Sequence, residues 1–447
     1  MAKIRSLNHQ IWDIAWPAIL SNISIPLLGL VDTAILGHLG STQYLGAVAI
    51  GGAILSFLYW GFSFLRMGTT GLVAKAMGAG QATAALLILA QSCVLALVLA
   101  VLVILLHPLW LQFGFALMSP SEGLVPIAKS YATIRIYSAP AVLMTYAIVG
   151  WFIGRQNTRW PMVIVVTTNI ANIGLDFLLI VGLGLNSDGA AMATVIAEYL
   201  GCILALYAVW RHLPQRPDPT FYQQLLRWSA YRRLLKSNRH LFVRTTCLLF
   251  SFAFFTAMGD KLGTEVLAAN TIMMQLLMLA AYGMDGFAYA AEALTGHRIG
   301  GRDLEGFSRV VRNCSLWCAG SATLISLLFL LWRIPLFALF TDIDQIQRLM
   351  VEYQWWLVVL PLIAAPSYLL DGVFIGTAET RYMMLTMLFS TLFVYLPAWY
   401  LTQAWGNHGL WFAFALFNGA RGLSLQLCYW RLHRRQAWLK QPTSTKE

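Results

Sequence analysis

The sequence FIGRQNTRWPM, from Phe152 to Met162, returns as FIGTAETRYMM from Phe374 to Met384, with Phe, Ile, Gly, Thr, Arg and Met at a constant offset of 222. Further pairs at this offset are Tyr131 and Tyr353, Gly150 and Gly372, Gly61 and Gly283, and Gly78 and Gly300. An offset shared over so much of the chain indicates that the sequence contains two copies of one unit.

The composition predicts a protein almost wholly embedded in a membrane. Of the 447 residues 59% are hydrophobic and only 11% are charged, with a mean hydropathy of +0.67. A soluble protein of this length carries about 25% charged residues. Because the apolar runs of about 20 residues are continuous and do not alternate with polar residues, they predict membrane-spanning helices and not a barrel.

Twelve such spans are expected, six on either side of a basic connector. They are Trp16–Gly37, Leu45–Met67, Ala84–Leu106, Tyr131–Gly154, Met162–Val181, Gly189–Val209, Leu241–Met258, Val266–Leu294, Cys314–Phe337, Met350–Ile375, Met383–Ala404 and Gly409–Leu432. The expected fold is all-α and polytopic, with an N-lobe (1–209), a cytoplasmic linker (210–240), a C-lobe (241–432) and a tail (433–447). Repeats with an even number of spans share one topology, so the lobes are expected to be related by a pseudo-two-fold axis along the membrane normal. This arrangement is typical of transporters.

The net charge of +11 comes mainly from Lys and Arg in the tails and in loops on one side of the membrane. The positive-inside rule then predicts both termini in the cytoplasm of a bacterial inner-membrane protein, and no nucleic-acid partner is needed to explain the charge. The connector carries a basic, aromatic segment, Phe221–Phe242, which predicts a helix lying on the anionic inner leaflet.

No catalytic motif, phosphate loop or metal-ligand spacing is present, so an enzyme, a metal site and a bound cofactor are not expected. The six cysteines lie in or beside apolar runs and are expected to act as small hydrophobic residues.

The first span, WPAILSNISIPLLGLVDTAILGHLG from Trp16 to Gly40, buries one carboxylate, Asp32. An acid inside a membrane costs about 3 kcal/mol on insertion scales and is by default a functional candidate. Pro26 removes a backbone donor upstream, which predicts a hinge below the acid. The alternative is a packing kink with a tolerated acid.

Depth counted along the spans places Asp32, Asp176 and Thr194 in one layer, roughly 8 to 9 Å inside the outer ends of their helices. Asn172 shares one helix face with Asp176. Two carboxyl groups in such a layer are expected to titrate as a unit and to exchange a proton, or to help bind Na⁺. The alternative is a hydrogen-bond cluster with fixed protonation. The candidate cation-coupling residues are Asp32, Asn169, Asn172, Asp176, Thr194 and Glu198.

The second half lacks these acids, because the positions equivalent to Asp32, Asn172 and Asp176 hold Phe254, Val394 and Ala398. Its own acids are Asp285, Glu292 and Asp371, of which Asp371 is either a substrate contact or a cap for the adjacent loop. Met and aromatic side chains suit promiscuous apolar or cationic ligands. The candidates for lining a substrate path are Met144, Tyr146, Met274, Gln275, Asp285, Tyr289 and Asp371.

Three motifs closely resemble the multidrug and toxic compound extrusion (MATE) family, nearest to its DNA-damage-inducible-protein-F branch. They are LVDTAILGHLG at Leu30–Gly40, FIGRQNTR at Phe152, and NIANIGLDFLLIVGLGLNSDGAAMATVIAEY at Asn169–Tyr199. The resemblance implies twelve helices in two lobes around a V-shaped cavity, and export of organic cations driven by inward H⁺ or Na⁺. It also implies that Asp32, Asn172, Asp176 and Thr194 match the family's cation site.

One departure favours H⁺ over Na⁺ as the coupling ion. Sodium-coupled relatives carry a Glu in the seventh span beside an acid in the tenth, whereas here Leu241–Met258 contains no acid and only Asp371 is present. We therefore predict a proton-coupled exporter of small hydrophobic or cationic solutes, monomeric and in contact with lipid, with a Na⁺-coupled exporter as an alternative. A lipid-intermediate flippase is the other alternative, and the intramembrane arginines that would support it are Arg66, Arg135, Arg244 and Arg421.

Overall fold

The structure is a computed structural model that describes residues 6–37, 42–118, 123–213 and 219–439. Some sequence predictions lie outside these residues: the basic N-terminal residues Lys3 and Arg5, the end of the Leu30–Gly40 motif, part of the connector and the last residues of the tail. The described chain is helical throughout and holds no strand. The predicted all-α class is therefore confirmed.

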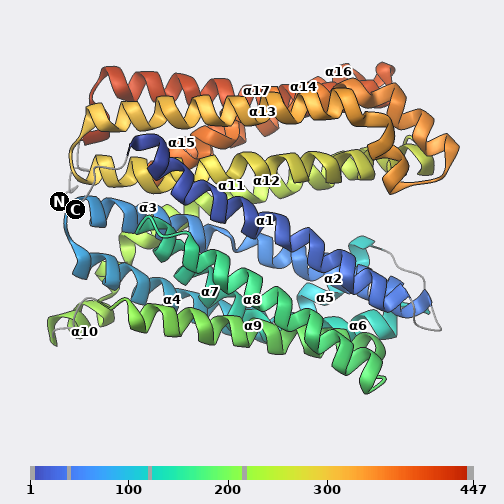
Figure 1. Cartoon of the computed structure of the whole chain (residues 1–447), viewed down its shortest axis with the longest axis horizontal. Coiled ribbons are helices and arrows are strands. Elements are labelled where there is room, and N and C mark those ends of the chain that lie inside the picture. The colour runs from blue at the N-terminus through green and yellow to red at the C-terminus, as the bar shows by residue number, and fades with distance from the viewer. Residues whose placement is uncertain (1–5, 38–41, 119–122, 214–218, 440–447) are drawn as a thin grey trace. The chain divides into compact units, whose positions relative to one another are not determined.

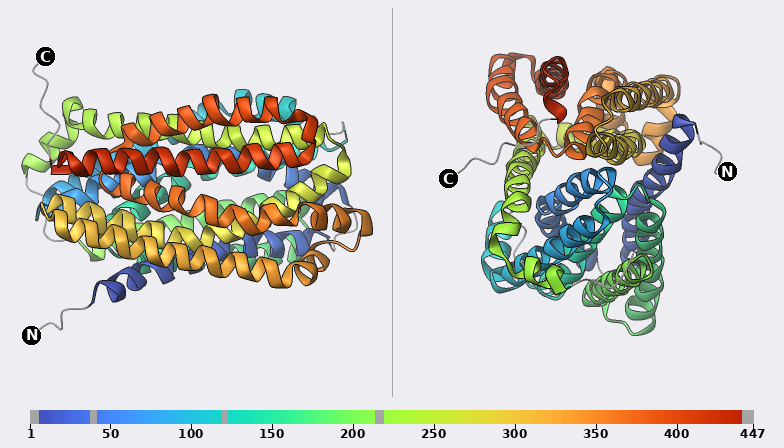
Figure 2. Two further views of the ribbon diagram at one scale, coloured as in Figure 1. Left: turned by 90° about the horizontal axis from the view of Figure 1, so that it is seen from above. Right: turned by 90° about the vertical axis from the view of Figure 1, so that its left-hand side faces the viewer.

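Internal contacts divide the chain into two compact units (Figures 1 and 2). The first unit comprises Leu20–Val73 and Gln81–Leu235, and the second comprises Met1–Ile19, Ala74–Gly80 and Lys236–Glu447. In chain order, the helices from the N-terminus to the connector are α1 (Leu7–Gly37), α2 (Thr42–Gly61), α3 (Phe64–Gly78), α4 (Ala82–Leu105), α5 (His107–Met118), α6 (Val125–Arg135), α7 (Ala139–Gly154), α8 (Arg159–Asp176), α9 (Asn186–Arg211) and α10 (Pro219–Leu226).

The remaining helices are α11 (Trp228–Asp260), α12 (Thr264–Gly300), α13 (Leu304–Phe340), α14 (Asp344–Gly376), α15 (Thr380–Phe389), α16 (Leu396–Leu401) and α17 (Asn407–Arg434). Two π-helical segments, η2 (Phe177–Gly182) and η3 (Ser390–Tyr395), continue α8 and α15. Short 3₁₀ turns are η1 (Ile136–Ser138), η4 (Gln403–Trp405) and η5 (Ala437–Leu439).

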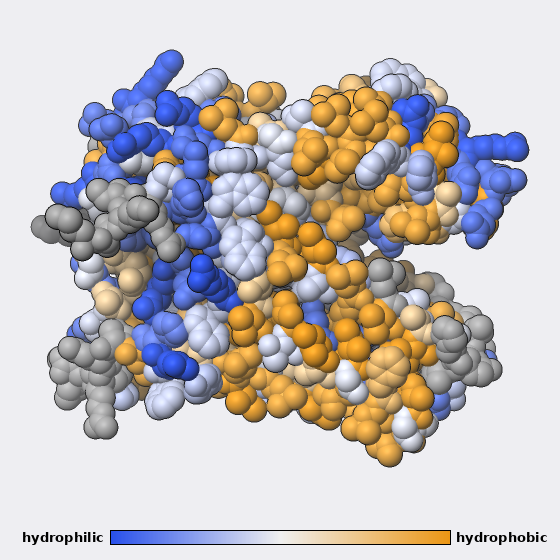
Figure 3. Space-filling model, viewed as in Figure 1, coloured by the Kyte–Doolittle hydropathy of each residue, from blue (hydrophilic) through white to orange (hydrophobic). Residues whose placement is uncertain are grey.

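Eleven helical segments of the described chain are long and apolar enough to cross a membrane. The twelfth predicted span, Gly409–Leu432, corresponds to α17, which is a continuous helix of 28 residues but carries buried polar side chains, including Asn418 and Arg421. On the face shown in Figure 3, apolar side chains gather over the middle of the helices and hydrophilic ones at their ends. This is the distribution expected of a helical membrane protein.

The backbone repeats at the same offset of 222 as the sequence. Residues with positive φ recur as pairs: Gly80 and Arg302, Gln156 and Ala378, and Gly184 and Gly406. Helix ends recur as well, because α7 ends at Gly154 and α14 at Gly376, while α4 begins at Ala82 and α13 at Leu304. The two halves of the chain therefore build the same helical turns at equivalent positions.

Glycines let the same helices approach closely in each half. A Cβ at Gly150 would collide with the backbone of Arg66, and a Cβ at Gly372 would collide with the backbone of Ala288. One turn further on, the corresponding pairs are Gly154 with Thr70, and Gly376 with Glu292. The two contacts in one half correspond to the two in the other at the offset of 222. In lipid there is no hydrophobic driving force between helices, so small residues at helix crossings allow the close packing that holds them together.

Two elements differ from their predicted form. The basic segment Phe221–Phe242 is not one separate helix, because its first residues belong to α10, which ends at Leu226, and α11 begins at Trp228 and runs without a break into the seventh span. The first span is helical through Pro26, so the hinge predicted there stays a prediction.

Candidate functional site

The candidate site lies inside the first unit, where α1, α8 and α9 contribute one polar layer. Asp32 sits near the end of α1, Asp176 is the last residue of α8, and Thr194 lies two turns into α9. Helices α8 and α9 pack directly against each other. Asp176 is only 1% exposed although no basic side chain forms an ion pair with it in the described part of the chain. The predicted layer is thus present in the structure.

The carboxyl groups of Asp32 and Asp176 lie within hydrogen-bonding reach of each other. An ionised carboxylate only accepts hydrogen bonds, so two carboxyl groups bond to each other only when one of them carries a proton. The second oxygen of each acid is buried and has no hydrogen-bond partner among the described residues. The geometry thus fits a pair of acids that holds one proton and has free acceptor capacity.

Asn172 links the acid pair to α9. In the amide orientation that satisfies both neighbours, its nitrogen donates to Oδ2 of Asp176 at 3.0 Å, and its oxygen accepts from the hydroxyl and the backbone N–H of Thr194, both at 3.1 Å. The position of Asn172 one turn before Asp176 makes this possible, because residues four apart share a helix face. Four of the predicted residues therefore form one connected group, which we call the acid cluster: Asp32, Asn172, Asp176 and Thr194.

The other two predicted residues lie beside the acid cluster. Asn169 donates from its amide nitrogen to the hydroxyl of Ser24 at 3.0 Å and to its carbonyl at 3.2 Å, which ties α8 to α1 just before Pro26. Glu198 forms no hydrogen bond to the acid cluster among the described residues and instead interacts electrostatically with Arg135. The predicted polar stripe on α8 is therefore real, while Glu198 faces a different partner.

The sequence showed Arg135 only as an intramembrane charge, whereas in the structure it acts electrostatically on the acids of the site. Its guanidinium acts electrostatically on Asp32, Asp176 and Glu198. Nη1 donates to the hydroxyl of Tyr131 at 2.9 Å, while Nε is buried without a partner among the described residues. A lone arginine in an apolar run was the available signal, but its distance in sequence from the acids hid the relation.

An apolar layer lies directly beyond the acid cluster. On α1 and after α8, its buried members follow the acids by about one turn, and on α9 they precede Thr194. The members are Ile35, Leu36, Tyr131, Ile180, Ala190 and Ala191. Partly buried side chains of α2 and α6 pack against them. The sequence did not predict this layer.

The π-helix η2 begins immediately after Asp176. Such segments inside α-helices are uncommon and are frequently found at functional sites, because the wider turn leaves backbone carbonyls less firmly bonded. Asp176 therefore lies at a junction where α8 changes its winding.

The equivalent place in the second unit is filled by aromatic rings. Phe254, which replaces Asp32, packs edge-on against Tyr395 with ring centroids 5.5 Å apart and against Trp399 at 5.0 Å. Ala398, which replaces Asp176, belongs to the same hydrophobic cluster. The absence of acids predicted for this half corresponds to a packed apolar core.

Asp371 lies instead between two arginines. One of its carboxylate oxygens accepts from Arg244 and, at 2.9 Å, from Arg421, and all three side chains are buried. Arg421 also donates to Asn418 at 3.1 Å and lies over the ring of Phe417. We call Asp371, Arg244 and Arg421 the ion triad. Because its carboxylate is matched by two guanidinium groups, Asp371 is poorly suited to bind a cation.

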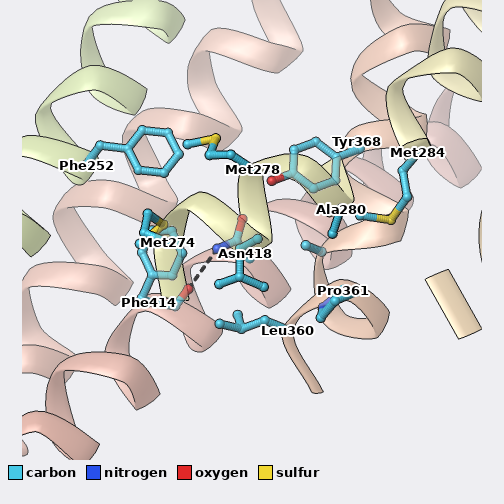
Figure 4. A pocket seen from close by; sticks show the side chains of 12 residues that line it. Phe252, Met274, Met278, Ala280, Met284, Leu360, Pro361, Tyr368, Phe414 and Asn418 are labelled. Atoms are coloured by element: carbon cyan, nitrogen blue, oxygen red, sulfur yellow. Dashed lines mark hydrogen bonds between the residues drawn. The ribbon is translucent and has the colours of Figure 1, made fainter. Parts of the chain in front are cut away.

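A pocket with an empty volume of about 350 Å³ opens among α11, α12, α14 and α17 (Figure 4). Its lining is mostly sulfur, aromatic and aliphatic, with Tyr368 and Asn418 as the polar exceptions. The lining residues are Phe252, Met274, Leu277, Met278, Ala280, Met284, Leu360, Pro361, Ala364, Tyr368, Phe414 and Asn418. Asn418 joins this pocket to the ion triad through Arg421.

Only one of the predicted path residues, Met274, lines this pocket. Gln275 is exposed on α12, whereas Asp285 and Tyr289 lie further along the same helix. Met144 and Tyr146 are half-buried on α7, in the first unit. No group of His, Cys, Asp and Glu suited to a metal ion is found among the residues that the structure describes.

Comparison with known proteins gives one consistent result. The family model MatE matches residues 17–178 and 241–401. The DNA damage-inducible protein F of Escherichia coli K12 is 40% identical over 436 residues, which cover 97% of this chain and 94% of that protein.

Solved structures share the fold. The Vibrio cholerae MATE transporter VcmN in its bent form superposes with a TM-score of 0.85 at 22% identity, covering 98% of this chain and 99% of that one. A MATE structure in a straight conformation gives a TM-score of 0.83 at 20% identity and covers 97% of each chain. These likenesses extend over both halves of the chain and include the twelve-helix, two-lobed arrangement.

Proposed function

This chain belongs to the MATE family of efflux transporters, and we propose that it exports small hydrophobic or cationic molecules in exchange for protons bound at the acid cluster. Family membership makes it a multi-pass membrane transporter and not an enzyme. The observation that carries the proposal is the close approach of the Asp32 and Asp176 carboxyl groups beside Asn172, because two such groups at this distance favour holding one proton between them.

The acid cluster suits an exchange of one positive charge for another. With one proton, Asp32 and Asp176 together keep one negative charge and two unpartnered oxygens. An organic cation or a second proton neutralises this one negative charge, so binding of either disfavours binding of the other. A competition of this kind at one site is sufficient to couple two opposite fluxes.

We propose that protonation is transmitted to the rest of α1 through the contacts around Pro26. Asp32 and the Ser24–Asn169 hydrogen bonds both hold α1 against α8, on either side of the proline. A proline interrupts the hydrogen-bond ladder, which makes this part of α1 the easiest place for it to bend. Structural neighbours are described in a bent and in a straight form, so the fold is known in two conformations.

Na⁺ coupling in the second unit finds no support. The acid that would bind the ion, Asp371, is already matched by Arg244 and Arg421. The same ion triad weakens the flippase alternative, because two of the arginines that would bind a pyrophosphate are engaged with a carboxylate. Arg135 donates to Tyr131, and Arg66 also has a partner.

We propose that the pocket among Phe252, Met274, Met278, Tyr368 and Phe414 receives the apolar part of a substrate. Flexible thioethers and aromatic faces adapt to ligands of different shape. Met278→Trp should reduce transport of a bulky dye more than that of a small cation, whereas Leu279→Trp, at an exposed neighbour, should affect neither.

The location also follows as a proposal. Most Lys and Arg residues lie in the tails and in loops on one side of the membrane. The positive-inside rule assigns that side to the cytoplasm, so we propose that both termini are cytoplasmic. A bacterial inner membrane agrees with the bacterial relative. A monomer remains our expectation.

The decisive experiment uses purified protein in sodium-free proteoliposomes with the membrane potential clamped. An imposed pH gradient should drive accumulation of tetraphenylphosphonium, a small apolar cation, on the acidic side, and adding this cation should release protons. Asp32→Asn should abolish both signals. Asp342→Asn removes an exposed acid between α13 and α14 and serves as the matched control.

Two results would overturn the proposal. Accumulation driven by a Na⁺ gradient at equal pH, with no response to the pH gradient, would assign a different ion. Undiminished proton release by Asp32→Asn would remove the acid cluster from the coupling step.

A further inference from the structure

The second unit is strongly polarised in charge between its two ends. The end at which α12 and α14 finish and α13 begins is rich in arginine: Arg298, Arg302, Arg309, Arg312, Arg381, Arg431, Arg434 and Arg435. The opposite end carries more acids than bases: Asp260, Glu265, Asp342, Asp344 and Glu352 against Lys261, Arg333 and Arg348. We call the first of these the basic end.

Some arginines at the basic end are already matched. Asp303 accepts from Arg298 at 3.0 Å, and Glu305 lies 4.0 Å from Arg309. In contrast, the arginines at the start of α15 and the end of α17 form no ion pair with any residue that the structure describes. They are Arg381, Arg431, Arg434 and Arg435, and all four are exposed.

These four unpaired arginines line two adjoining pockets. One, with about 800 Å³ of empty volume, is formed by Arg381, Tyr382, Leu385, Arg431, Leu432, Arg435 and Ala437. The other, of about 540 Å³, is formed by Leu427, Trp430, Arg431, Arg434 and Arg435. Arg431 and Arg435 belong to both, and neither lining includes an acid. The shared arginines make the two pockets one continuous basic surface.

The fold holds this surface in place. After α17 the chain turns at Gln436, which has a positive φ of 48°, and Trp438 is buried. The Trp438 ring packs against Phe307 at 5.2 Å and Phe374 at 5.4 Å between centroids. Because Trp438 anchors the chain just after the arginines, Arg434 and Arg435 are positioned by a packed core and not by a free tail.

Large apolar side chains extend from the same pockets along the outer faces of α15 and α17. They are Leu385, Phe389, Leu423, Leu427 and Trp430, and each is at least 46% exposed. In a membrane protein such a stripe faces the acyl chains of lipid. Positive charge at the membrane surface, continued by an apolar stripe toward its centre, complements a molecule with a phosphate head and hydrocarbon tails.

We infer that these two pockets bind the headgroup of an anionic phospholipid at the cytoplasmic surface. Guanidinium groups bind phosphate oxygens in a bidentate manner, and basic pockets between helices on this side of a membrane favour such headgroups. Two pockets with shared arginines can hold two phosphates, so cardiolipin, which has two phosphates on one molecule, binds more tightly than phosphatidylglycerol, which has one. The inference is independent of the proposed proton coupling.

Native mass spectrometry of the full chain, released from detergent with each lipid titrated, measures this binding. Cardiolipin should bind more tightly than phosphatidylglycerol, and phosphatidylethanolamine should bind weakly. Arg431→Gln with Arg435→Gln should weaken cardiolipin binding by about tenfold or more, since each arginine at the membrane surface contributes about fivefold. Arg309→Gln with Arg312→Gln removes the same charge from the same end of the unit and should change little.

Two further arms keep the result interpretable. The variant Arg431→Lys with Arg435→Lys keeps the charge and should retain most of the binding, which separates loss of charge from loss of fold. Inorganic pyrophosphate should not displace cardiolipin at millimolar concentration. Equal lipid binding by the Gln variant and the wild type would overturn the inference, and displacement by pyrophosphate would reassign the pockets to a free phosphate compound.

Discussion

The two halves of this chain place opposite chemistry at equivalent positions. In the first unit Asp32, Asp176 and Asn172 form one polar group, whereas their counterparts are Phe254 and Ala398, which pack in an aromatic core, and the apolar Val394. Duplication supplied the same helices twice, but only one copy carries carboxyl groups at these positions. A pseudo-symmetric fold can therefore pack one half with apolar side chains where the other half holds acids.

The ion triad shows the reverse relation. Asp371, Arg244 and Arg421 are buried in the second unit, and their counterparts Val149, Asn22 and Tyr199 carry no charge. Buried charges that match each other contribute structure, whereas a buried acid pair that lacks a cationic partner is free to exchange a proton. The comparison thus separates an ion-paired acid, Asp371, from two acids, Asp32 and Asp176, that form no ion pair with any residue that the structure describes.

The largest expected effect is the loss of stability when the ion triad is broken. Asp371→Asn leaves two buried guanidinium groups without their carboxylate, which should lower the free energy of unfolding by about 3–5 kcal/mol. Thermal unfolding in detergent measures it. Replacing all three residues with apolar ones of similar size should restore most of the stability, and an unchanged melting temperature in Asp371→Asn would contradict the structural role.

Asp176→Asn should do the opposite. Asn keeps the size of the side chain and can still hydrogen-bond to Asp32, so the melting temperature should be retained. In the wild type, protonation should change the affinity for substrate by about 5- to 150-fold, the usual range of coupling between two ligands. In Asp176→Asn this difference in affinity between two pH values should be lost. Substrate binding at two pH values measures this, and a variant that still couples binding to pH would remove Asp176 from the exchange.

A swap of one residue between the halves sharpens the contrast. Asn172→Val gives the first unit the residue found at the equivalent position of the second, and removes the hydrogen bonds to Asp176 and Thr194. The free energy of unfolding should fall by about 1–3 kcal/mol, because Asp176 loses a buried donor, and transport should weaken.

The reciprocal variant, Val394→Asn, is the control for this swap. It introduces the same amide where no acid is available to accept from it, so it should leave pH-driven transport unchanged. Loss of coupling in Val394→Asn would show that the aromatic core also takes part.

The smallest effect concerns a helix cap that only one half possesses. Asp303 accepts from the backbone N–H of Gly306 at 2.7 Å at the start of α13, whereas its counterpart Gln81 makes no such bond at the start of α4. Asp303→Gln should cost about 1 kcal/mol of unfolding free energy. Gln81→Asp should stabilise α4 by a similar or smaller amount.

The Asp303 effect should depend on pH. The Gly306 N–H, with the Arg298 guanidinium, holds the pKa of Asp303 below its ordinary value. A carboxyl group with a lowered pKa in the folded state stabilises the protein above its ordinary pKa of about 3.9 and loses that contribution as the pH falls further. The difference in melting temperature between wild type and Asp303→Gln should therefore be present at pH 7 and shrink below about pH 4.

Much of the candidate site was predictable because helical periodicity is a local property. The spacing of Asn169, Asn172 and Asp176 placed them on one face of α8, and the structure confirms that face. Counting from span ends brought Asp32 and Thr194 to the same depth. Glu198 shows the limit of this reasoning, because it was predicted beside Thr194 but interacts with Arg135.

The partners of the arginines could not be predicted in this way. Arg244 and Arg421 stand far from Asp371 in sequence, and only the packing of α11, α14 and α17 brings them together. The apolar layer beyond the acid cluster likewise combines side chains from α1, η2 and α9. Such relations depend on which helix faces meet, and a single sequence contains no local signal for that.

By itself the sequence determined the membrane class, the duplication and the half that carries Asp32 and Asp176, because hydropathy, repeat offset and residue type are all written along one chain. Tertiary packing alone decided that Asp32 and Asp176 lie together beside Asn172 while Asp371 is held by two arginines. The reason is physical: a buried carboxyl group takes its charge state from the groups that surround it in space, and neighbouring helices supply those groups.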